Sequence, residues 1–259
     1  MAVQNSLTQR KPTFTTFLSG DAVKRKINTI IGGKDGQLFI TAITSAVSTN
    51  PALAECDNST ILSAALLGAR LKLSPSPQLG QYYIVPYNDK KRGCKVAQFQ
   101  LGYKGYIQLA IRSGQYKKLN VLPIKQGELV HFDPLNEEIE VNLIDDEFAR
   151  ENAPTAGYYA MFEYTNGFKK GMYWSREKMM AHADKYSPAF SAESYQKLLD
   201  GEIPEKDMWK YSSFWYRNFD DMACKTMLRQ LISRWAVMSI EMQQALAIDE
   251  HIISEDGTG

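Results

Sequence analysis

The sequence predicts an α+β protein with an antiparallel β-sheet core and flanking helices. Apolar residues recur at helical spacing over residues 35–47 and again from Ser175 onward. Between these regions, residues 79–174 contain short runs that alternate in polarity or are rich in β-branched and aromatic residues, as strands are. Asn166–Gly167, between two such runs, is the strongest hairpin turn signal in the chain. Helices at both ends of a meandering sheet are typical of the α+β class.

Each predicted element has its own local signal. Pro51 limits the helix over residues 35–47, and Asn58 or Ser59 can cap a second helix through Leu71. The expected strands are residues 79–87, 96–101, 116–124, 128–132, 138–143, 156–164 and 168–174, with a basic turn over 88–93. A short central helix is expected to bury Tyr106, Ile107, Ala110 and Ile111 and to end at Ser113–Gly114. The later helices are expected at residues 175–186, 191–200, 213–235 and 239–248.

Length and composition favour a single folded domain. At 259 residues with 44% hydrophobic content, the chain can bury a sizeable core. We expect a flexible N-terminal segment over residues 1–20, one domain over residues 21–248 and a flexible acidic tail over residues 249–259. No apolar run approaches the roughly 20 residues of a membrane span, so a soluble, cytoplasmic protein with no membrane partner is expected.

Cofactor and metal chemistry lacks its usual motifs. Cys56, Cys94 and Cys224 are widely spaced and odd in number, which favours free thiols over a disulfide framework. The three histidines are isolated from one another and from the cysteines, so no metal site is expected. Gly32–Gly33–Lys34 lacks the spacing and the hydroxyl of a phosphate-binding loop. We therefore expect no ATP hydrolysis and no cofactor.

Charge is strongly segregated along the chain. Nine lysines and arginines and no carboxylate lie between Asp89 and Glu128, which leaves 21 basic and 29 acidic residues elsewhere. In the same stretch Tyr103 and Tyr106 alternate with basic residues, and single-stranded nucleic acid requires this combination of charge for phosphates and flat rings for bases. The alternative is an ordinary sheet edge that lysines protect from aggregation.

The candidate DNA-binding residues lie on five predicted elements. Lys104, Gln108 and Arg112 form a stripe along the central helix, and Lys225 and Arg229 share one side of the helix over residues 213–235. Pairing of Arg217 and Lys225 with Asp221 is the alternative for that side. The full candidate set is Tyr103, Lys104, Tyr106, Arg112, Lys117, Lys118, Lys169, Lys170, Lys178, Lys185, Lys225 and Arg229.

An acidic segment follows the basic one. Residues 133–163 hold nine carboxylates and a single basic residue, Arg150. Three interpretations stay open: a two-metal nuclease site, a solvated face that repels DNA, or a surface that contacts the basic face of a neighbouring copy. Gly102–Tyr–Lys–Gly105 matches the loop of KH modules, but it follows a strand here and is weak support for a KH domain.

Three segments together carry a family resemblance. They are Leu-Gly-Gln-Tyr-Tyr-Ile-Val-Pro-Tyr (79–87), Leu-Gly-Tyr-Lys-Gly-Tyr-Ile-Gln-Leu-Ala-Ile-Arg-Ser-Gly (101–114) and Met-Ala-Cys-Lys-Thr-Met-Leu-Arg-Gln-Leu (222–231). In this order they closely resemble the RecT family of phage-type single-strand annealing proteins, over roughly residues 40–248. Two departures are Cys224, where the family commonly has a basic residue, and Arg70 with Lys72, where neutral residues are more common.

The resemblance implies a function and a set of partners. It implies an ATP-independent, non-enzymatic protein that coats single-stranded DNA, pairs it with a complementary strand and assembles into rings or helical filaments. It also implies a core related to Rad52-type annealing domains, a companion 5′ to 3′ exonuclease, and a phage or prophage origin. Lys104 and Lys225 inherit the family's DNA-binding role by motif position, whereas the other candidates rest on charge and placement. A metal-dependent nuclease and a plain single-strand-protecting module are the rival hypotheses.

Overall fold

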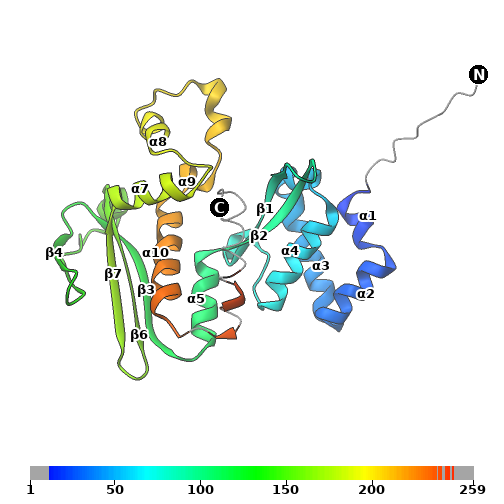
Figure 1. The fold of residues 1–259 in the computed structure, drawn as a ribbon, viewed down its shortest axis with the longest axis horizontal. Coiled ribbons are helices and arrows are strands. Elements are labelled where there is room, and N and C mark those ends of the chain that lie inside the picture. The colour runs from blue at the N-terminus through cyan, green and yellow to red at the C-terminus, as the bar shows by residue number, and fades with distance from the viewer. Residues whose placement is uncertain (1–11, 238, 241–242, 246, 248–259) are drawn as a thin grey trace, which may run out of the picture. The chain divides into compact units, whose positions relative to one another are not determined.

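The computed structural model describes residues 12–237, 239–240, 243–245 and 247. Contacts divide the chain into two compact units, Met1–Gln100 and Leu101–Gly259, and so divide the span predicted as one domain after Gln100. Residues 1–11, the predicted tail over 249–259 and much of the predicted helix over 239–248 lie outside the described residues. Figure 1 shows helices and antiparallel strands in both units, which confirms the α+β class.

The first unit combines helices with one β-hairpin. Its elements are α1 (Phe14–Leu18), α2 (Asp21–Ile30), α3 (Gly33–Ser48), η1 (Pro51–Glu55), α4 (Asn58–Arg70), η2 (Pro77–Leu79), β1 (Tyr82–Asp89) and β2 (Cys94–Leu101). The Asp57 side chain caps α4 by accepting from the Ser59 amide at 2.7 Å, one residue before the predicted cap. Phe14 and Leu18 are buried, so part of the segment predicted to be flexible is a packed helix.

The tip of the β1–β2 hairpin is basic, as predicted. Asp89 accepts from the amides of Lys91 and Arg92 at 2.9 and 3.0 Å, and the amide of Gly93 donates to the Asp89 carbonyl at 2.8 Å. Gly93 has φ +63°, a conformation that costs glycine little. These bonds hold a tight turn from which the lysine side chains extend into solvent.

The second unit is built on a three-stranded antiparallel sheet in the order β3–β6–β7. Its strands are β3 (Tyr116–Lys125), β4 (Leu129–Asp133), β5 (Glu138–Val141), β6 (Thr155–Tyr164) and β7 (Lys169–Ser175), with β4 and β5 forming a separate ribbon. Its helices are α5 (Tyr103–Arg112), α6 (Glu147–Asn152), α7 (Arg176–Tyr186), α8 (Ala192–Leu199), η3 (Glu205–Tyr211), α9 (Phe214–Arg217) and α10 (Phe219–Trp235). The predicted β6–β7 hairpin around Asn166–Gly167 is confirmed.

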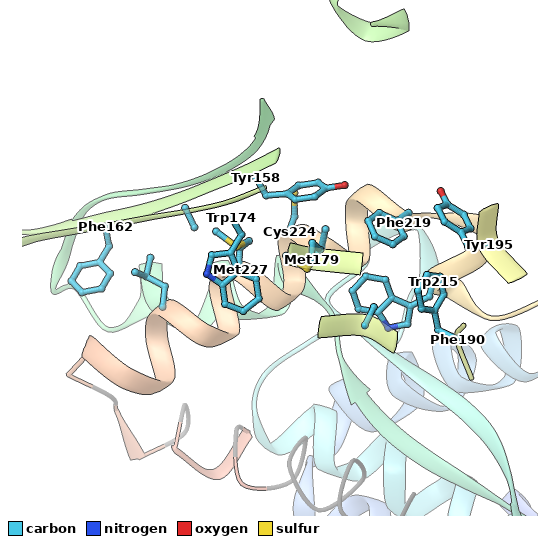
Figure 2. Close-up of a cluster of buried hydrophobic side chains, with 14 of the residues drawn as sticks. Tyr158, Phe162, Trp174, Met179, Phe190, Tyr195, Trp215, Phe219, Cys224 and Met227 are labelled. Atoms are coloured by element: carbon cyan, nitrogen blue, oxygen red, sulfur yellow. The ribbon is translucent and has the colours of Figure 1, made fainter. Parts of the chain in front are cut away.

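Alternation along β6 separates the two faces of this sheet. Tyr158, Ala160 and Phe162 are fully buried and belong to the cluster that includes Met227 of α10 (Figure 2). The intervening residues point to the opposite face because successive side chains of a strand alternate. In Figure 1, α10 runs alongside the sheet. The second unit therefore has two distinct outer surfaces: one is formed by the helices that cover the buried face of the sheet, and the other is the opposite face of the sheet itself.

The long helix predicted over residues 213–235 is interrupted. Asn218 has φ −137° and ψ 62°, outside the helical region, and separates the one-turn α9 from α10. Asp220 and Asp221 then occupy the first turn of α10, where carboxylates favour a helix start because of the helix dipole. The prediction of one continuous helix was wrong at Asn218, although the regions on both sides are helical.

Asp220 fixes the start of α10 on the sheet. Its Oδ1 accepts from the Tyr158 hydroxyl at 2.6 Å and its Oδ2 accepts from the Thr155 hydroxyl at 2.8 Å. The Arg176 guanidinium lies 3.5 Å from the same Oδ1. These bonds join β6, α7 and α10 and set the rotation of α10 about its axis.

A buried ion pair supports the same end of the sheet, next to Lys125, which pairs with Thr155 across β3 and β6. Glu128 is fully buried and accepts from Arg150 Nε at 2.6 Å and from Arg150 Nη2 at 3.2 Å. The amides of Lys125 and Ile144 also donate to this carboxylate, at 2.8 and 3.2 Å. Arg150 comes from α6, a helix that the sequence did not predict and that Asp146 caps through the Ala149 amide at 2.9 Å. The single base of the acidic segment is thus structural.

Gly157→Ala is expected to destabilise the protein by about 1–3 kcal/mol, because β6 leaves no room for a Cβ there. A Cβ on Gly157 would lie 2.6 Å from the Trp174 carbonyl oxygen and 2.3 Å from the Tyr173 hydroxyl oxygen. Gly171→Ala is a matched control, since its closest neighbour is the mobile end of Tyr159 at 2.9 Å. Urea denaturation of both variants measures the difference, and equal midpoints would contradict the packing argument.

Candidate nucleic-acid interface

Helix α5 presents part of the predicted basic stripe. Lys104 and Arg112 are exposed, and Arg112 Nε donates to the Gln108 carbonyl at 3.2 Å. Tyr103 is half-buried at the first position of the helix. Tyr106 is fully buried, so its ring is a core residue and cannot stack on a base in this structure. We therefore correct its assignment to the DNA-binding set. Ile111, predicted to be buried, is 59% exposed.

Helix α10 places Lys225 and Arg229 away from the sheet. Both are half-buried, and on a helical projection they lie opposite Met227, which is fully buried in the core. Cys224 is on the buried side, where burial raises the pKa of its thiol to about 12. The departure at Cys224 therefore falls on a core position rather than on the solvent-facing side of the helix. α10 also packs against α5, the helix that carries Lys104 and Arg112.

Helix α7 adds basic and aromatic groups. Lys178 Nζ lies 4.7 Å from the centroid of the Trp174 ring, and Lys185 Nζ lies 5.1 Å from that of Tyr186. Between them the His182 ring lies 5.1 Å from the Trp174 ring and 4.6 Å from the Tyr186 ring. Residues 178, 182 and 185 share one side of the helix by their spacing, so cations and rings alternate along α7.

The basic residues of α10 also affect the pKa of His182. Burial lowers its pKa first, and the positive charges of Arg229, Arg234, Lys178 and Lys185 lower it further. Two helices thus contribute to one positively charged surface around a histidine. His182 and Arg234 were not among the predicted site residues. The spacing of Lys178, His182 and Lys185 was the signal that could have found the histidine.

The opposite face of the sheet carries a second basic group. Cross-strand pairing aligns Lys118, Glu163 and Lys169 on β3, β6 and β7. Lys117 Nζ lies 2.5 Å from Glu163 Oε1, and Lys118 Nζ lies 3.8 Å from Glu163 Oε2. We name Lys117, Lys118 and Lys169 the lysine corner. Its three lysines are exposed, while Glu163 is half-buried among them.

Lys170 differs from its neighbour Lys169. Its ammonium forms an ion pair with Glu137 and lies 3.6 Å from the centroid of the Trp235 ring. Its side chain is only 18% exposed. In this structure Lys170 therefore holds the β4–β5 turn and the end of α10 to the edge of β7, and we assign it a structural role in place of DNA contact.

The acidic segment does not converge on one point. Glu137 and Glu163 of this segment face Lys170 and Lys117 at separate places in the second unit, and Glu128, just before the segment, faces Arg150. Among the described residues, no three His, Cys, Asp or Glu side chains come together as they would around a metal ion.

Comparison with known proteins identifies the family. The sequence profile of the RecT family matches residues 37–258, most of the chain. The chain belongs to the RecT family. The match covers all three segments that carried the resemblance, so that resemblance is confirmed. RecT family membership supports a protein of DNA recombination that works by single-strand annealing.

Two relatives show how far the similarity extends. An uncharacterised protein, YqaK of Bacillus subtilis, is 36% identical over 250 residues, which are 96% of this chain and 74% of YqaK. Protein RecT of Escherichia coli is 27% identical over 219 residues, which are 82% of this chain and 70% of that protein. In the part of this RecT family member that the structure describes, no helix is both long and apolar enough to cross a membrane.

Proposed function

We propose that this RecT family member is an ATP-independent, non-enzymatic annealing protein that coats single-stranded DNA as an oligomer and pairs it with a complementary strand. The observation that supports this most directly is the layer formed by α5, α7 and α10. Each of these helices presents basic side chains, namely Lys104, Arg112, Lys178, Lys185, Lys225 and Arg229. Positive charge on one layer of a folded unit suits a polyphosphate backbone.

The chemistry of annealing follows from which part of DNA is held. Lysine and arginine contacts to phosphates position a strand but read no sequence. The base edges then stay free to test a second strand, and Watson–Crick pairing supplies the specificity. Tyr103 at the start of α5 and Tyr186 beside Lys185 provide rings for sequence-independent stacking.

One experiment separates this proposal from its two rivals. Labelled complementary oligonucleotides are incubated with the protein and magnesium, with and without ATP. An annealer accelerates duplex formation equally in both conditions, whereas a nuclease shortens the strands and a protecting module slows pairing. Shortened or slowly paired strands would overturn the proposal.

Assembly is part of the proposed function. One subunit with a site comparable to an OB module covers about 4–16 nucleotides, too few to distinguish true from accidental complements. Many subunits along one strand, as a ring or a helical filament, provide a longer test length. A 5′ to 3′ exonuclease that exposes single strands is the proposed partner, and the proposed setting is the bacterial cytoplasm with a phage or prophage origin.

Charge reversal on and just before α6 tests whether the acidic segment takes part in assembly. Lys substitutions at Asp145, Glu147 and Glu151 together are expected to weaken assembly on DNA. These exposed acids flank Phe148, which is 79% exposed. Aromatic rings are enriched at protein interfaces, and reversing the charges around the ring would repel a basic surface of the next subunit. Asp146 is left intact because it caps α6. Electron microscopy and sedimentation measure assembly, and circular dichroism confirms the fold. Normal assemblies from a folded triple variant would make these acids ordinary solvated surface.

A further inference from the structure

The lysine corner contains a carboxylate, Glu163, that competes with phosphate for the lysines. Glu163 is on the central strand, directly between Lys118 of β3 and Lys169 of β7. A register shift between Tyr116 and Lys118 brings Lys117 to the same carboxylate. One negative charge therefore sits among three positive charges, a pattern that a purely structural ion pair does not require.

The geometry makes the carboxylate the held partner and the lysines the mobile ones. The side chain of Glu163 is 17% exposed, whereas those of Lys117 and Lys118 are 59% and 64% exposed. A hydrogen bond from Lys117 is the main cause that lowers the pKa of Glu163, and the charges of Lys117, Lys118 and Lys169 lower it further. Glu163 is thus ionised at neutral pH and reduces the net charge of the corner to two.

Such an arrangement is easily reversed. Ion pairs of exposed lysines are weak because water and salt screen them. A DNA phosphate offers the lysines another charged acceptor, with two non-bridging oxygens. Lys170 provides the contrast, since its ammonium is enclosed between Glu137 and the Trp235 ring. The lysines of the corner can exchange one anion for another, whereas Lys170 is held in place.

We infer that Glu163 is an intramolecular counter-ion that DNA phosphate displaces from the lysine corner, and that it limits the affinity of the corner for single-stranded DNA. The inference rests on the proposed function, because it assumes that the protein binds single strands. Its consequence is reversibility: a strand held against a competing carboxylate is released more readily, as an annealing protein requires when it tests mismatched complements.

Glu163→Gln tests the inference. The amide keeps the shape of the side chain and removes its charge, so affinity for an oligothymidylate is expected to rise about threefold to tenfold at low salt. The plot of log affinity against log salt is expected to steepen by about 0.7, the value for one more neutralised phosphate on a single strand. Fluorescence anisotropy over a salt series measures both quantities.

A cycle of variants makes the result specific to the corner. In a background where Lys117 and Lys118 are both replaced by Met, Glu163→Gln is expected to give less than a twofold gain. Glu193→Gln is the matched control, since Glu193 pairs with Lys197 at 2.6 Å on α8, outside the corner. The affinity of this control variant for the oligothymidylate is expected to equal that of the parent protein.

The outcomes are distinguishable. Unchanged affinity of a folded Glu163→Gln protein overturns the inference, and weaker affinity does so as well, because it makes Glu163 a support for the lysines. An equal gain in the background that lacks Lys117 and Lys118 also overturns it. If the parent protein binds no single strand at all, the proposed function fails instead. Thermal melting of each variant verifies that the proteins compared are folded.

Discussion

Replacing Lys104 and Lys225 together by Gln is expected to weaken binding to single-stranded DNA by about 100-fold at moderate salt. Each charge-assisted contact contributes roughly 1.5–3 kcal/mol and about 1.4 kcal/mol corresponds to a factor of ten, so 100-fold is the loss at the low end of this range for two contacts. The two lysines come from α5 and α10, which pack against each other, and the proposed function places one strand across both helices. Annealing is expected to fall with binding, because the protein acts only on the strand that it holds.

Salt dependence verifies that the lost contacts are to phosphate. The slope of log affinity against log salt is expected to decrease by about 0.7 for each lysine removed. Lys197→Gln is the control, because it removes a positive charge that Glu193 already neutralises on α8. If the double variant keeps the parent's affinity and slope, the DNA site lies elsewhere on the molecule.

Glu128→Gln is expected to lower the free energy of unfolding by about 3 kcal/mol, the low end for breaking a buried ion pair. The variant leaves the Arg150 guanidinium, 25% exposed, without the carboxylate that accepts two of its hydrogen bonds. A loss of this size lowers the melting temperature of a chain this long by about 6–12 °C. Differential scanning calorimetry measures it, with the exposed Glu193→Gln as control.

The same carboxyl group makes stability depend on pH. Burial by itself would raise the pKa of Glu128, but hydrogen bonds from Arg150 and from the amides of Lys125 and Ile144 hold it below the usual 4.5. A group with a lowered folded-state pKa contributes stability above its unfolded pKa and loses that contribution as pH falls through the folded value. The difference between parent and Glu128→Gln is therefore expected to be largest near pH 7 and to shrink below about pH 4.5. A constant difference down to pH 3 would contradict this assignment.

Much of the fold was predictable from local patterns. Alternation along residues 156–164 marked β6, Asn166–Gly167 marked its hairpin, and helical spacing marked α3, α4 and α7. Short or interrupted elements were missed, because six residues of α6 give no recognisable period and one non-helical residue, Asn218, leaves the apolar pattern on both sides intact. The Asp146 cap was the local signal available for α6.

The sequence by itself determined the family, the fold class and the clustering of basic residues, because three ordered motifs and a run without carboxylates can be recognised without coordinates. Only the tertiary structure decided which of these residues can meet a ligand. Tyr106 and Tyr103 are three positions apart, yet one is fully buried and the other half-exposed. Lys169 and Lys170 are adjacent, yet alternation along β7 turns one toward Glu163 and the other toward Glu137 and Trp235. Lys117 and Lys170 pair with Glu163 and Glu137, which are 46 and 33 positions away, and distance along the chain does not reveal which carboxylate the fold brings to which lysine.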